Sequence, residues 1–306
     1  MKVVIVIAGP TAVGKTELCV KLAQELNTEI VSADSRQFYK ELSIGTAKPT
    51  VEEMQGIRHH FIDSHSIQDY FSVGDFEREC LQTLEAIFSR KDVVILTGGS
   101  GLFLKTITDG LDEMPEVDLS VREELMQRFA EQGITPLVEE LRRLDPAYFE
   151  YVDRNNTQRI VRALEVCLST GKPYSSFRTG QKAKRPFEVI KICLTRDREV
   201  LYDRINRRVN LMMEAGLIDE VKSVTDYREH YALKTVGYQE VFEYFDGTYD
   251  SGKMVEKIQQ NSRRYAKRQL TWFRHQGDFQ WFEASDYEGV KAYILDQLAG
   301  YRSSNA

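Results

Sequence analysis

The sequence predicts an α/β fold in which a parallel sheet is flanked by helices and carries a helical insertion domain. Three apolar runs rich in β-branched residues indicate buried parallel strands: residues 3–8, 93–97 and 189–194. Helical patterns separate these runs, as expected when helices cover both faces of one sheet. A shorter run at 29–33 predicts a further strand.

The first predicted strand leads directly into the octapeptide Gly9-Pro-Thr-Ala-Val-Gly-Lys-Thr16, which fits the pattern G-x-x-x-x-G-K-[ST]. A helix is predicted over 17–26, so the motif lies between strand and helix, as in P-loop NTPase-like folds. The two glycines let backbone N–H groups turn inward, and the helix N-terminus adds positive potential. Lys15 then bridges phosphate oxygens, and the Thr16 hydroxyl ligates Mg²⁺. We therefore predict a di- or triphosphate site made by Gly9, Pro10, Thr11, Ala12, Val13, Gly14, Lys15 and Thr16.

The segment Asp34-Ser-Arg-Gln37 follows the second predicted strand, at the sheet edge where open α/β folds bind ligands. A carboxylate at this place is suited to act as a general base toward a substrate amine. The alternative is that Asp34 caps the N-terminus of a helix. Because this position faces the acceptor pocket in phosphate-loop proteins, the base is favoured.

The strand at 93–97 ends in Thr97-Gly-Gly-Ser-Gly101 and not in an acidic residue. Motor and switch NTPases usually carry an Asp here to hold Mg²⁺, and the chain also lacks an Asn-Lys-x-Asp segment that would read guanine. Both absences argue against a GTPase or a motor ATPase. The glycines allow close approach, so Ser100 contacts a substrate, unless the segment is a plain Gly-rich turn.

The helix predicted after the last core strand carries an arginine at the edge of its buried face. With about 100° per residue, Arg208 falls about 20° from the apolar stripe over 201–212, whereas Arg204 and Arg207 lie further round. An arginine in this position needs an anion, either a diphosphate or a carboxylate in a salt bridge.

Between Asp112 and about residue 153 the chain becomes rich in Glu, Arg and Leu, with helical patterns at 121–132, 136–144 and 146–152. We place a helical insertion domain at 113–152. The phosphate-loop core with its C-terminal helices then comprises 1–112 and 153–306.

The composition is that of a soluble globular chain, with 42% hydrophobic and 29% charged residues. No apolar run approaches membrane-spanning length. Because Met1-Lys2-Val3 leads directly into the first predicted strand, we expect no signal peptide. Four widely spaced cysteines predict unpaired thiols in a reducing cytoplasm.

Positive charge is concentrated locally although the net charge is −6. Residues 257–277 contain six Lys or Arg and no acidic residue, and residues 171–192 contain six against one. On the helix predicted at 158–165, Arg159 and Arg162 share a face. On the helix predicted at 263–273, one side carries Arg263, Arg264, Lys267, Arg268 and the adjoining Arg274, and the other carries Ala266, Leu270 and Phe273. The charged side has no acidic partner and repels itself unless a polyanion binds, which favours contact with RNA phosphates over a merely solvated surface.

These motifs together resemble the bacterial-type tRNA dimethylallyltransferases, also named tRNA isopentenyltransferases, over nearly the whole chain. Besides the phosphate loop, the resemblance rests on Asp34-Ser-Arg-Gln37, Gly45-Thr-Ala-Lys-Pro49, His59-His60-Phe-Ile-Asp63, Tyr70-Phe-Ser-Val-Gly-Asp-Phe76, Gly98-Gly-Ser-Gly-Leu102, Arg159-Ile-Val-Arg-Ala-Leu-Glu165, Gly171-Lys-Pro-Tyr-Ser175, Val236-Gly-Tyr-Gln-Glu240 and Arg264-Tyr-Ala-Lys-Arg-Gln-Leu-Thr-Trp272. Phe103 stands where the family often has Tyr, and the C-terminal zinc finger of eukaryotic members has no counterpart.

The resemblance implies transfer of a dimethylallyl group from dimethylallyl diphosphate to N6 of adenosine 37, in the tRNA anticodon loop, by a monomeric cytoplasmic enzyme that uses Mg²⁺. Asp34 would take the amine proton, Thr11 would lie at the reaction centre, and Lys15 and Arg208 would stabilise the departing diphosphate. The residues implied to contact tRNA are Asp34, Ser35, Arg36, Gln37, Ser100, Arg122, Gln158, Arg159, Ile160, Val161, Arg162 and, within 232–239, Lys234 and Tyr238. The adenine is expected to leave the loop stack and enter a channel.

Two alternatives share the phosphate loop and the parallel sheet. A small-molecule or nucleotide kinase would use ATP and release ADP, and an adenylate isopentenyltransferase would prefer free AMP to tRNA. The two basic surfaces exceed what a kinase needs, which favours the tRNA enzyme.

Overall fold

The protein is described by a computed structural model covering residues 1–304. The chain divides into a core unit, 1–109 with 184–306, and a helical unit, Gly110–Ala183. The expected insertion at 113–152 is therefore too short at its far end. The reason is that α8 (Thr157–Thr170) packs against the two preceding long helices of the insertion and shares their hydrophobic core.

The core unit is built on a six-stranded sheet in the order β3-β2-β4-β1-β5-β6, with all neighbouring strands parallel. The strands are β1 (Val3–Ala8), β2 (Ile30–Ser32), β3 (His59–His60), β4 (Val93–Gly98), β5 (Glu188–Thr195) and β6 (Gln280–Glu283). The predicted α/β class and the strands β1, β2, β4 and β5 are confirmed. The edge strands β3 and β6 were not predicted because each is too short to show a clear apolar pattern.

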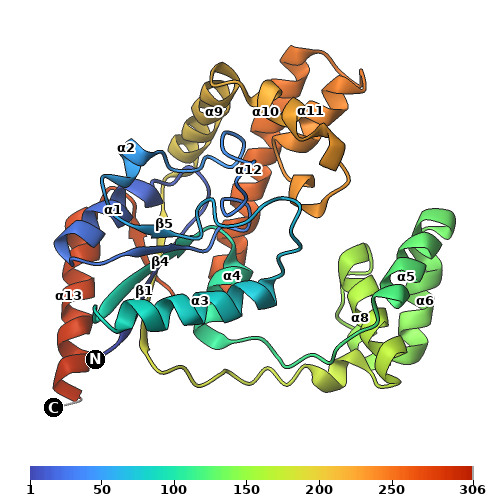
Figure 1. The fold of residues 1–306 in the computed structure, drawn as a ribbon, viewed down its shortest axis with the longest axis horizontal. Helices are drawn as coiled ribbons and strands as arrows, with labels where there is room; N and C mark the ends of the chain where they lie inside the picture. The colour runs from blue at the N-terminus through green and yellow to red at the C-terminus, as the bar shows by residue number, and fades with distance from the viewer. Residues whose placement is uncertain (305–306) are drawn as a thin grey trace. The chain divides into compact units, whose positions relative to one another are not determined.

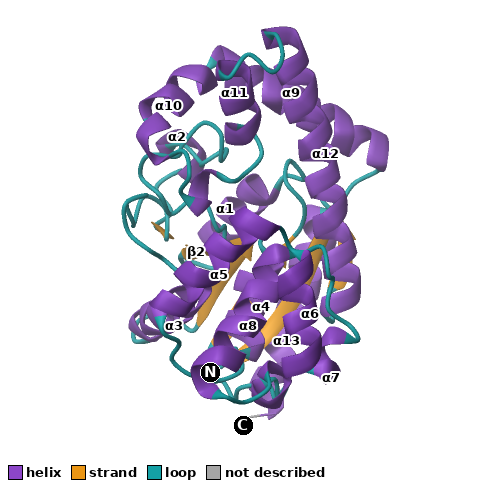
Figure 2. Ribbon diagram, turned by 90° about the vertical axis from the view of Figure 1, so that its right-hand side faces the viewer, coloured by secondary structure: helices purple, strands orange, loops and turns teal. Residues whose placement is uncertain are grey.

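Helices cover both faces of the sheet, whose strands lie side by side in Figure 2. The helices of the core unit are α1 (Lys15–Glu25), α2 (Val51–Met54), α3 (Val73–Phe88), α4 (Gly101–Asp109), α9 (Arg198–Glu214), α10 (Leu217–Ser223), α11 (Tyr238–Phe245), α12 (Ser251–Gln276) and α13 (Tyr287–Ser304), with short 3₁₀ turns at Thr225–Tyr227 and Tyr231–Leu233. One apolar cluster joins the sheet to α1, α9 and α13, and α13 lies beside α1 in Figure 1. The other joins it to α3, α4, α10, α11 and α12.

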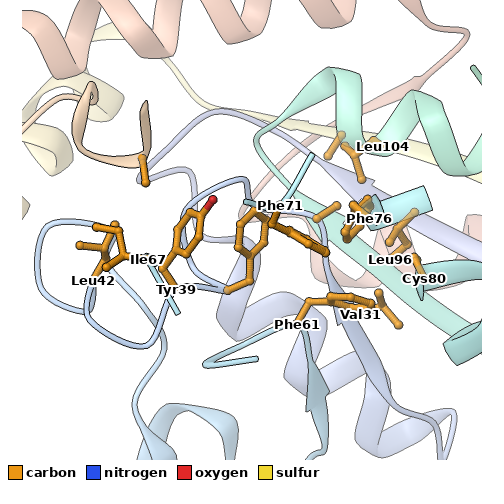
Figure 3. Packing of buried hydrophobic residues seen from close by; sticks show 14 of the residues in the cluster. Val31, Tyr39, Leu42, Phe61, Ile67, Phe71, Phe76, Cys80, Leu96 and Leu104 are labelled. Carbon is orange, nitrogen blue, oxygen red and sulfur yellow. The ribbon is translucent and has the colours of Figure 1, made fainter. Parts of the chain in front are cut away.

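Residues 33–72 contain little regular structure, yet their aromatic side chains anchor them to the sheet. Tyr39, Phe61 and Phe71 are buried among residues of the second cluster. Figure 3 shows these rings in one row that continues to Val31 and Leu96 of the sheet. This packing holds the segment after β2 at the carboxyl edge of the sheet.

The helical unit has its own core. Its elements are α5 (Leu119–Gln132), α6 (Thr135–Leu144), α7 (Pro146–Phe149), α8 and a 3₁₀ turn at Tyr174–Phe177. Buried Asp145 accepts hydrogen bonds from the backbone of Tyr148 and from the backbone and hydroxyl of Ser175, which ties the 3₁₀ turn to α7. Within 1–304, no helix is both long enough and apolar enough to cross a membrane.

Candidate active site

A cavity of about 770 Å³ opens in the core unit where β1, β2 and β4 end. Its walls come from the phosphate loop, the segments that follow β2 and β4, and side chains of α9 and α12. Parallel strands present their carboxyl ends at one edge, so three segments far apart in the sequence meet here. The cavity is therefore where the sequence predicts a ligand.

The phosphate loop has the geometry that its motif predicts. Gly14 precedes α1 with φ 111°, a left-handed conformation that a residue without Cβ adopts without strain. No side chain caps the first turn of α1, so its N-terminal N–H groups have no side-chain acceptor. The Lys15 ammonium folds back and donates to the carbonyl oxygens of Gly9 and Pro10 at 2.9 Å each. The loop thus forms a cradle of donors at a helix N-terminus, which suits an anion.

The Lys15 ammonium is buried, and burial lowers its pKa from 10.5 to about 8. The negative charge of Asp34 opposes this shift, whereas the positive charge of Arg208 adds to it. A desolvated ammonium close to a guanidinium is stabilised by a bound anion, because the anion replaces the lost hydration and relieves the repulsion.

Arginines surround the loop on the side of α9. Arg208 Nη1 lies 3.5 Å from Thr11 Oγ1, Arg204 Nε donates to the Ala12 carbonyl at 2.8 Å, and Arg196 Nε donates to the Val13 carbonyl at 2.7 Å. Burial and the neighbouring Arg204 lower the pKa of Arg208.

Within the described chain, no carboxylate forms an ion pair with Arg208, so the salt-bridge alternative is not realised. Arg204, which the helical projection puts further from the apolar stripe than Arg208, also lines the cavity. It is four residues before Arg208, only about 40° away around the helix, and that spacing was a usable signal.

Gln269 of α12 links the phosphate loop to the turn after β4. Its side-chain oxygen accepts from the Thr11 N–H at 2.9 Å, and its amide nitrogen donates to the Gly99 carbonyl at 3.0 Å. The side chain is buried, so these bonds are shielded from water. Gln269 fixes the position of Thr11 relative to the sheet, and sequence reasoning missed it.

Asp34 lines the same cavity. One carboxylate oxygen accepts the Arg36 N–H at 3.0 Å, and no α-helix begins here, so the helix-cap alternative is not realised. The following Ser35 N–H donates to Ser100 Oγ at 3.2 Å, which joins the segment to the turn after β4. The cavity therefore holds a carboxylate and a phosphate cradle together.

Comparisons with known proteins identify the family. The family model described as IPP transferase matches residues 37–276. A tRNA dimethylallyltransferase 1 of Bacteroides thetaiotaomicron is 48% identical over 96% of each chain, and a tRNA dimethylallyltransferase of Christiangramia forsetii is 50% identical over 90% of this chain and 92% of its own.

Solved structures agree. A tRNA isopentenylpyrophosphate transferase of Bacillus halodurans is 36% identical, covers 100% of this chain and 99% of its own, and has a TM-score of 0.75. The chain belongs to the bacterial-type tRNA dimethylallyltransferase family. A eukaryotic dimethylallyltransferase acting on tRNA is 27% identical over 100% of this chain and 80% of its own, with a TM-score of 0.80. The chain is thus a tRNA-modifying prenyl transferase, and none of these relatives is named for phosphoryl transfer, as the kinase alternative would require.

Most residues of the core unit that are expected to contact tRNA line the cavity, whereas one is buried. Ser35, Arg36, Gln37 and Lys234 line the cavity together with Asp34. Tyr238 is fully buried and its hydroxyl donates to Glu220 at 2.6 Å, so the predicted contact of its side chain with tRNA is corrected. The ring packs in the hydrophobic core of the core unit.

Ser100 is half-buried and contacts residues that line the cavity. Besides its bonds to Ser35, it is hydrogen-bonded to the Tyr265 hydroxyl, and burial raises the pKa of Tyr265 to about 12. Tyr265 lines the cavity, whereas Ser100 does not. Ser100 therefore orients cavity residues, and this is more than a plain Gly-rich turn provides.

The helical unit contains the other expected tRNA contacts. Gln158 and Arg159 are exposed at the start of α8, whereas Ile160 and Val161 are buried in the core of the unit, which corrects the prediction that their side chains touch RNA. The remaining two arginines share one partner: Arg122 and Arg162 each lie 3.1 Å from the carboxylate of Glu165, which is fully buried. Glu165 thus holds two partly exposed cations close to each other.

The basic side chains of α12 lie in different environments. Arg263 donates to Asn206 of α9 at 2.5 Å, Arg268 lines the cavity, and Arg264 and Lys267 are exposed. Ala266 is buried as predicted, together with Phe273. Cationic side chains therefore continue from the cavity onto the exposed surface of α12.

Proposed function

We propose that this protein transfers the dimethylallyl group of dimethylallyl diphosphate to N6 of adenosine 37 in the tRNA anticodon loop and releases diphosphate. The main observation behind the proposal is that the phosphate cradle and the Asp34 carboxylate line the same cavity. A kinase can use the same pair of groups, so the family membership and the basic surfaces are what favour transfer of an allylic group to an amine of tRNA.

The phosphate end of the site binds the leaving group. The loop N–H groups and the N-terminus of α1 contact the diphosphate oxygens, and Lys15 and Arg208 neutralise the charge that grows as the allylic C–O bond breaks. Arg204 adds a further positive charge from the preceding turn of α9. These donors are held in place before the reaction, so little reorganisation is needed in the transition state.

Mg²⁺ fits this site as a partner of the diphosphate. Among the described residues no group of three His, Cys, Asp or Glu side chains could hold a metal, but Thr16 lines the cavity at the end of the loop. Mg²⁺ prefers oxygen ligands and keeps several waters, so the Thr16 hydroxyl with diphosphate oxygens is an adequate set. When bound, the ion neutralises negative charge on the diphosphate.

The acceptor end of the site carries the base. The adenine N6 attacks the allylic carbon, a C–N bond forms, the C–O bond to diphosphate breaks, and the leaving oxygen keeps the electron pair. Asp34 accepts the proton that N6 loses. Thr11 lines the same cavity, where its N–H donates to Gln269 and its hydroxyl is contacted by Arg208.

The tRNA would be bound by cavity residues and by arginines of the helical unit. An adenine inside a stacked loop cannot reach a carboxylate in a cavity, so adenosine 37 must leave the stack. Asp34, Ser35, Gln37 and Lys234 would contact it there, while Arg122, Arg159 and Arg162 bind phosphates. We propose that the protein acts as a monomer on tRNA in the cytoplasm.

A paired transfer assay tests this function. One reaction contains unmodified tRNA, labelled dimethylallyl diphosphate and Mg²⁺; the other contains γ-labelled ATP with nucleoside and nucleotide acceptors. Label is expected to enter tRNA only from the allylic donor and to map to adenosine 37. Transfer of phosphate from ATP, with no label entering tRNA, would refute the proposal. A preference for free AMP over tRNA would refute tRNA as the acceptor.

Asp34→Asn tests the base separately. The amide keeps the shape of the side chain but cannot accept the amine proton, so kcat is expected to fall by about 10²–10⁴-fold. Binding of tRNA and of dimethylallyl diphosphate, measured by filter binding and calorimetry, should change little. A variant that turns over at the wild-type rate would exclude Asp34 as the base.

A further inference from the structure

A short irregular segment of the core unit, residues 43–47, forms part of the cavity wall. Gly45, Thr46 and Ala47 line the cavity, although the segment belongs to no helix or strand. Backbone of this kind keeps one conformation only if its polar groups are bonded elsewhere. The identity of the group that binds this segment therefore bears on the shape of the cavity.

That group is the carboxylate of Glu220 on α10. It accepts three successive backbone N–H groups of the segment: those of Ser43 and Ile44 on one oxygen at 2.9 and 2.7 Å, and that of Gly45 on the other at 2.9 Å. Successive N–H groups that converge in this way form a concave anion site. Here the protein supplies the anion itself, and bonds of this charged type are among the stronger hydrogen bonds.

Tyr238 completes the arrangement from the first turn of α11. Its hydroxyl donates to the same Glu220 oxygen that Gly45 uses, at 2.6 Å. Burial and the charge of Glu220 raise the pKa of this phenol above its ordinary value, so it remains a donor. A Cβ at Gly45 would lie 2.5 Å from a carbon of the Tyr238 ring, so the close packing requires glycine.

The segment in turn holds Gln37, which lines the cavity three residues after Asp34. The Gln37 amide nitrogen donates to the carbonyl oxygens of Thr46 and Ala47 at 3.2 and 3.1 Å. Its oxygen accepts from the Ser32 hydroxyl at 3.4 Å. The orientation of Gln37 therefore depends on carbonyl groups of a segment that Glu220 holds at three successive N–H groups.

We propose that Glu220, with Tyr238, is a positioning residue for tRNA recognition: through the 43–47 segment it fixes Gln37 in the wall that receives the target adenosine. This inference rests on the proposed function, because it assumes that the adenosine enters the cavity beside Asp34. Glu220 does not line the cavity, and it acts only through the segment and Gln37.

Glu220→Gln is the first test. The amide keeps the size of the side chain but has one acceptor oxygen, so at least one backbone N–H or the Tyr238 hydroxyl loses its partner. We expect kcat/KM for tRNA to fall by about 10–100-fold, the effect of losing one or two hydrogen bonds to a charged group. The dissociation constant for dimethylallyl diphosphate should stay within about twofold, because the phosphate cradle is built from other segments.

A double-mutant cycle with Gln37→Ala tests whether Glu220 positions Gln37 or only stabilises the fold. If Glu220 acts through Gln37, adding Glu220→Gln to the Gln37→Ala protein should reduce kcat/KM for tRNA by less than about threefold. If the double variant loses kcat/KM by the full product of the two single-variant losses, the proposal is overturned. Tyr238→Phe gives a second, milder variant with the same pattern, which keeps the test decisive if Glu220→Gln folds poorly.

Glu41→Gln is the matched control. Its carboxylate also accepts two hydrogen bonds from a neighbouring segment, from the Ser66 hydroxyl at 2.7 Å and the Ile67 N–H at 2.8 Å, but neither residue lines the cavity. Its thermal stability should fall while kcat/KM for tRNA is retained. Failure of the wild-type protein to modify tRNA would refute the proposed function, whereas normal turnover of Glu220→Gln would refute only this inference.

Discussion

Raising the pH above 8 should weaken the binding of dimethylallyl diphosphate because Lys15 loses its proton there. Burial lowers the Lys15 pKa to about 8, with Arg208 acting in the same direction and Asp34 opposing them. The buried thiols of Cys19 and Cys193 also raise the Lys15 pKa. The bound diphosphate stabilises the charged ammonium, so the complex must hold a proton that the free protein has lost.

The magnitude follows from the fraction of free protein that keeps the proton. With a pKa of about 8, half of the Lys15 side chains are charged at pH 8 and about 3% at pH 9.5, so the apparent affinity should fall by about 15-fold over this range. The terminal phosphate of the ligand is already ionised there, since the second pKa of a phosphate monoester is about 6.

Calorimetry without tRNA measures this directly, because no reaction occurs in its absence. Titrations in two buffers with different heats of ionisation give the number of protons taken up on binding. We expect close to one proton at pH 9 and close to none at pH 7, with the uptake abolished in Lys15→Met. In Lys21→Met, which changes an exposed lysine on the same helix, the uptake should persist. Uptake near zero at pH 9 in the wild type would refute the reasoning.

Two further predictions concern charges at and away from the cavity. Arg204→Met should weaken dimethylallyl diphosphate binding by about 10–100-fold in calorimetry, the cost of one charged hydrogen-bond donor, whereas Arg207→Met, which removes an exposed side chain paired with Asp203, should leave it within about twofold. Glu165→Gln should lower the free energy of unfolding by about 1–3 kcal/mol in urea, because two arginines of the helical unit lose their shared buried carboxylate. Glu139→Gln, at an exposed pair, should have no measurable effect, and equal urea midpoints for both variants would contradict the interpretation of Glu165.

Local patterns predicted the parts of the site that lie within one stretch of sequence. The phosphate loop is determined by two glycines and a lysine at fixed spacing, and its geometry is as the motif requires. Arg208 was found from the 3.6-residue period of its helix. The same period puts Arg204 one helical turn before Arg208, but its contact with the phosphate loop was not predicted.

Contacts between distant segments were beyond sequence reasoning. Gln269 reaches Thr11 across 258 positions, and Glu220 reaches Ser43 across 177, so no local spacing indicates either pair. Tyr238 illustrates the converse error, since a polar aromatic residue within a recognised motif was taken for a contact residue. Its hydroxyl has a buried carboxylate as partner, and only the tertiary structure supplies that partner.

The 43–47 segment and the phosphate loop both suit an anion, but they differ in whether the protein supplies that anion itself. At the 43–47 segment, three backbone N–H groups converge on the protein's own carboxylate, Glu220, so that site is filled and its role is to hold backbone in place. At the phosphate loop, Lys15 is buried and bonded only to carbonyl oxygens, and Arg208 has no carboxylate partner among the described residues. Buried cations that are not in an ion pair with a carboxylate destabilise the protein, and a bound diphosphate reduces that penalty. The stability of the free protein is thus reduced where ligand binding can restore it, so dimethylallyl diphosphate should raise the melting temperature through these cations.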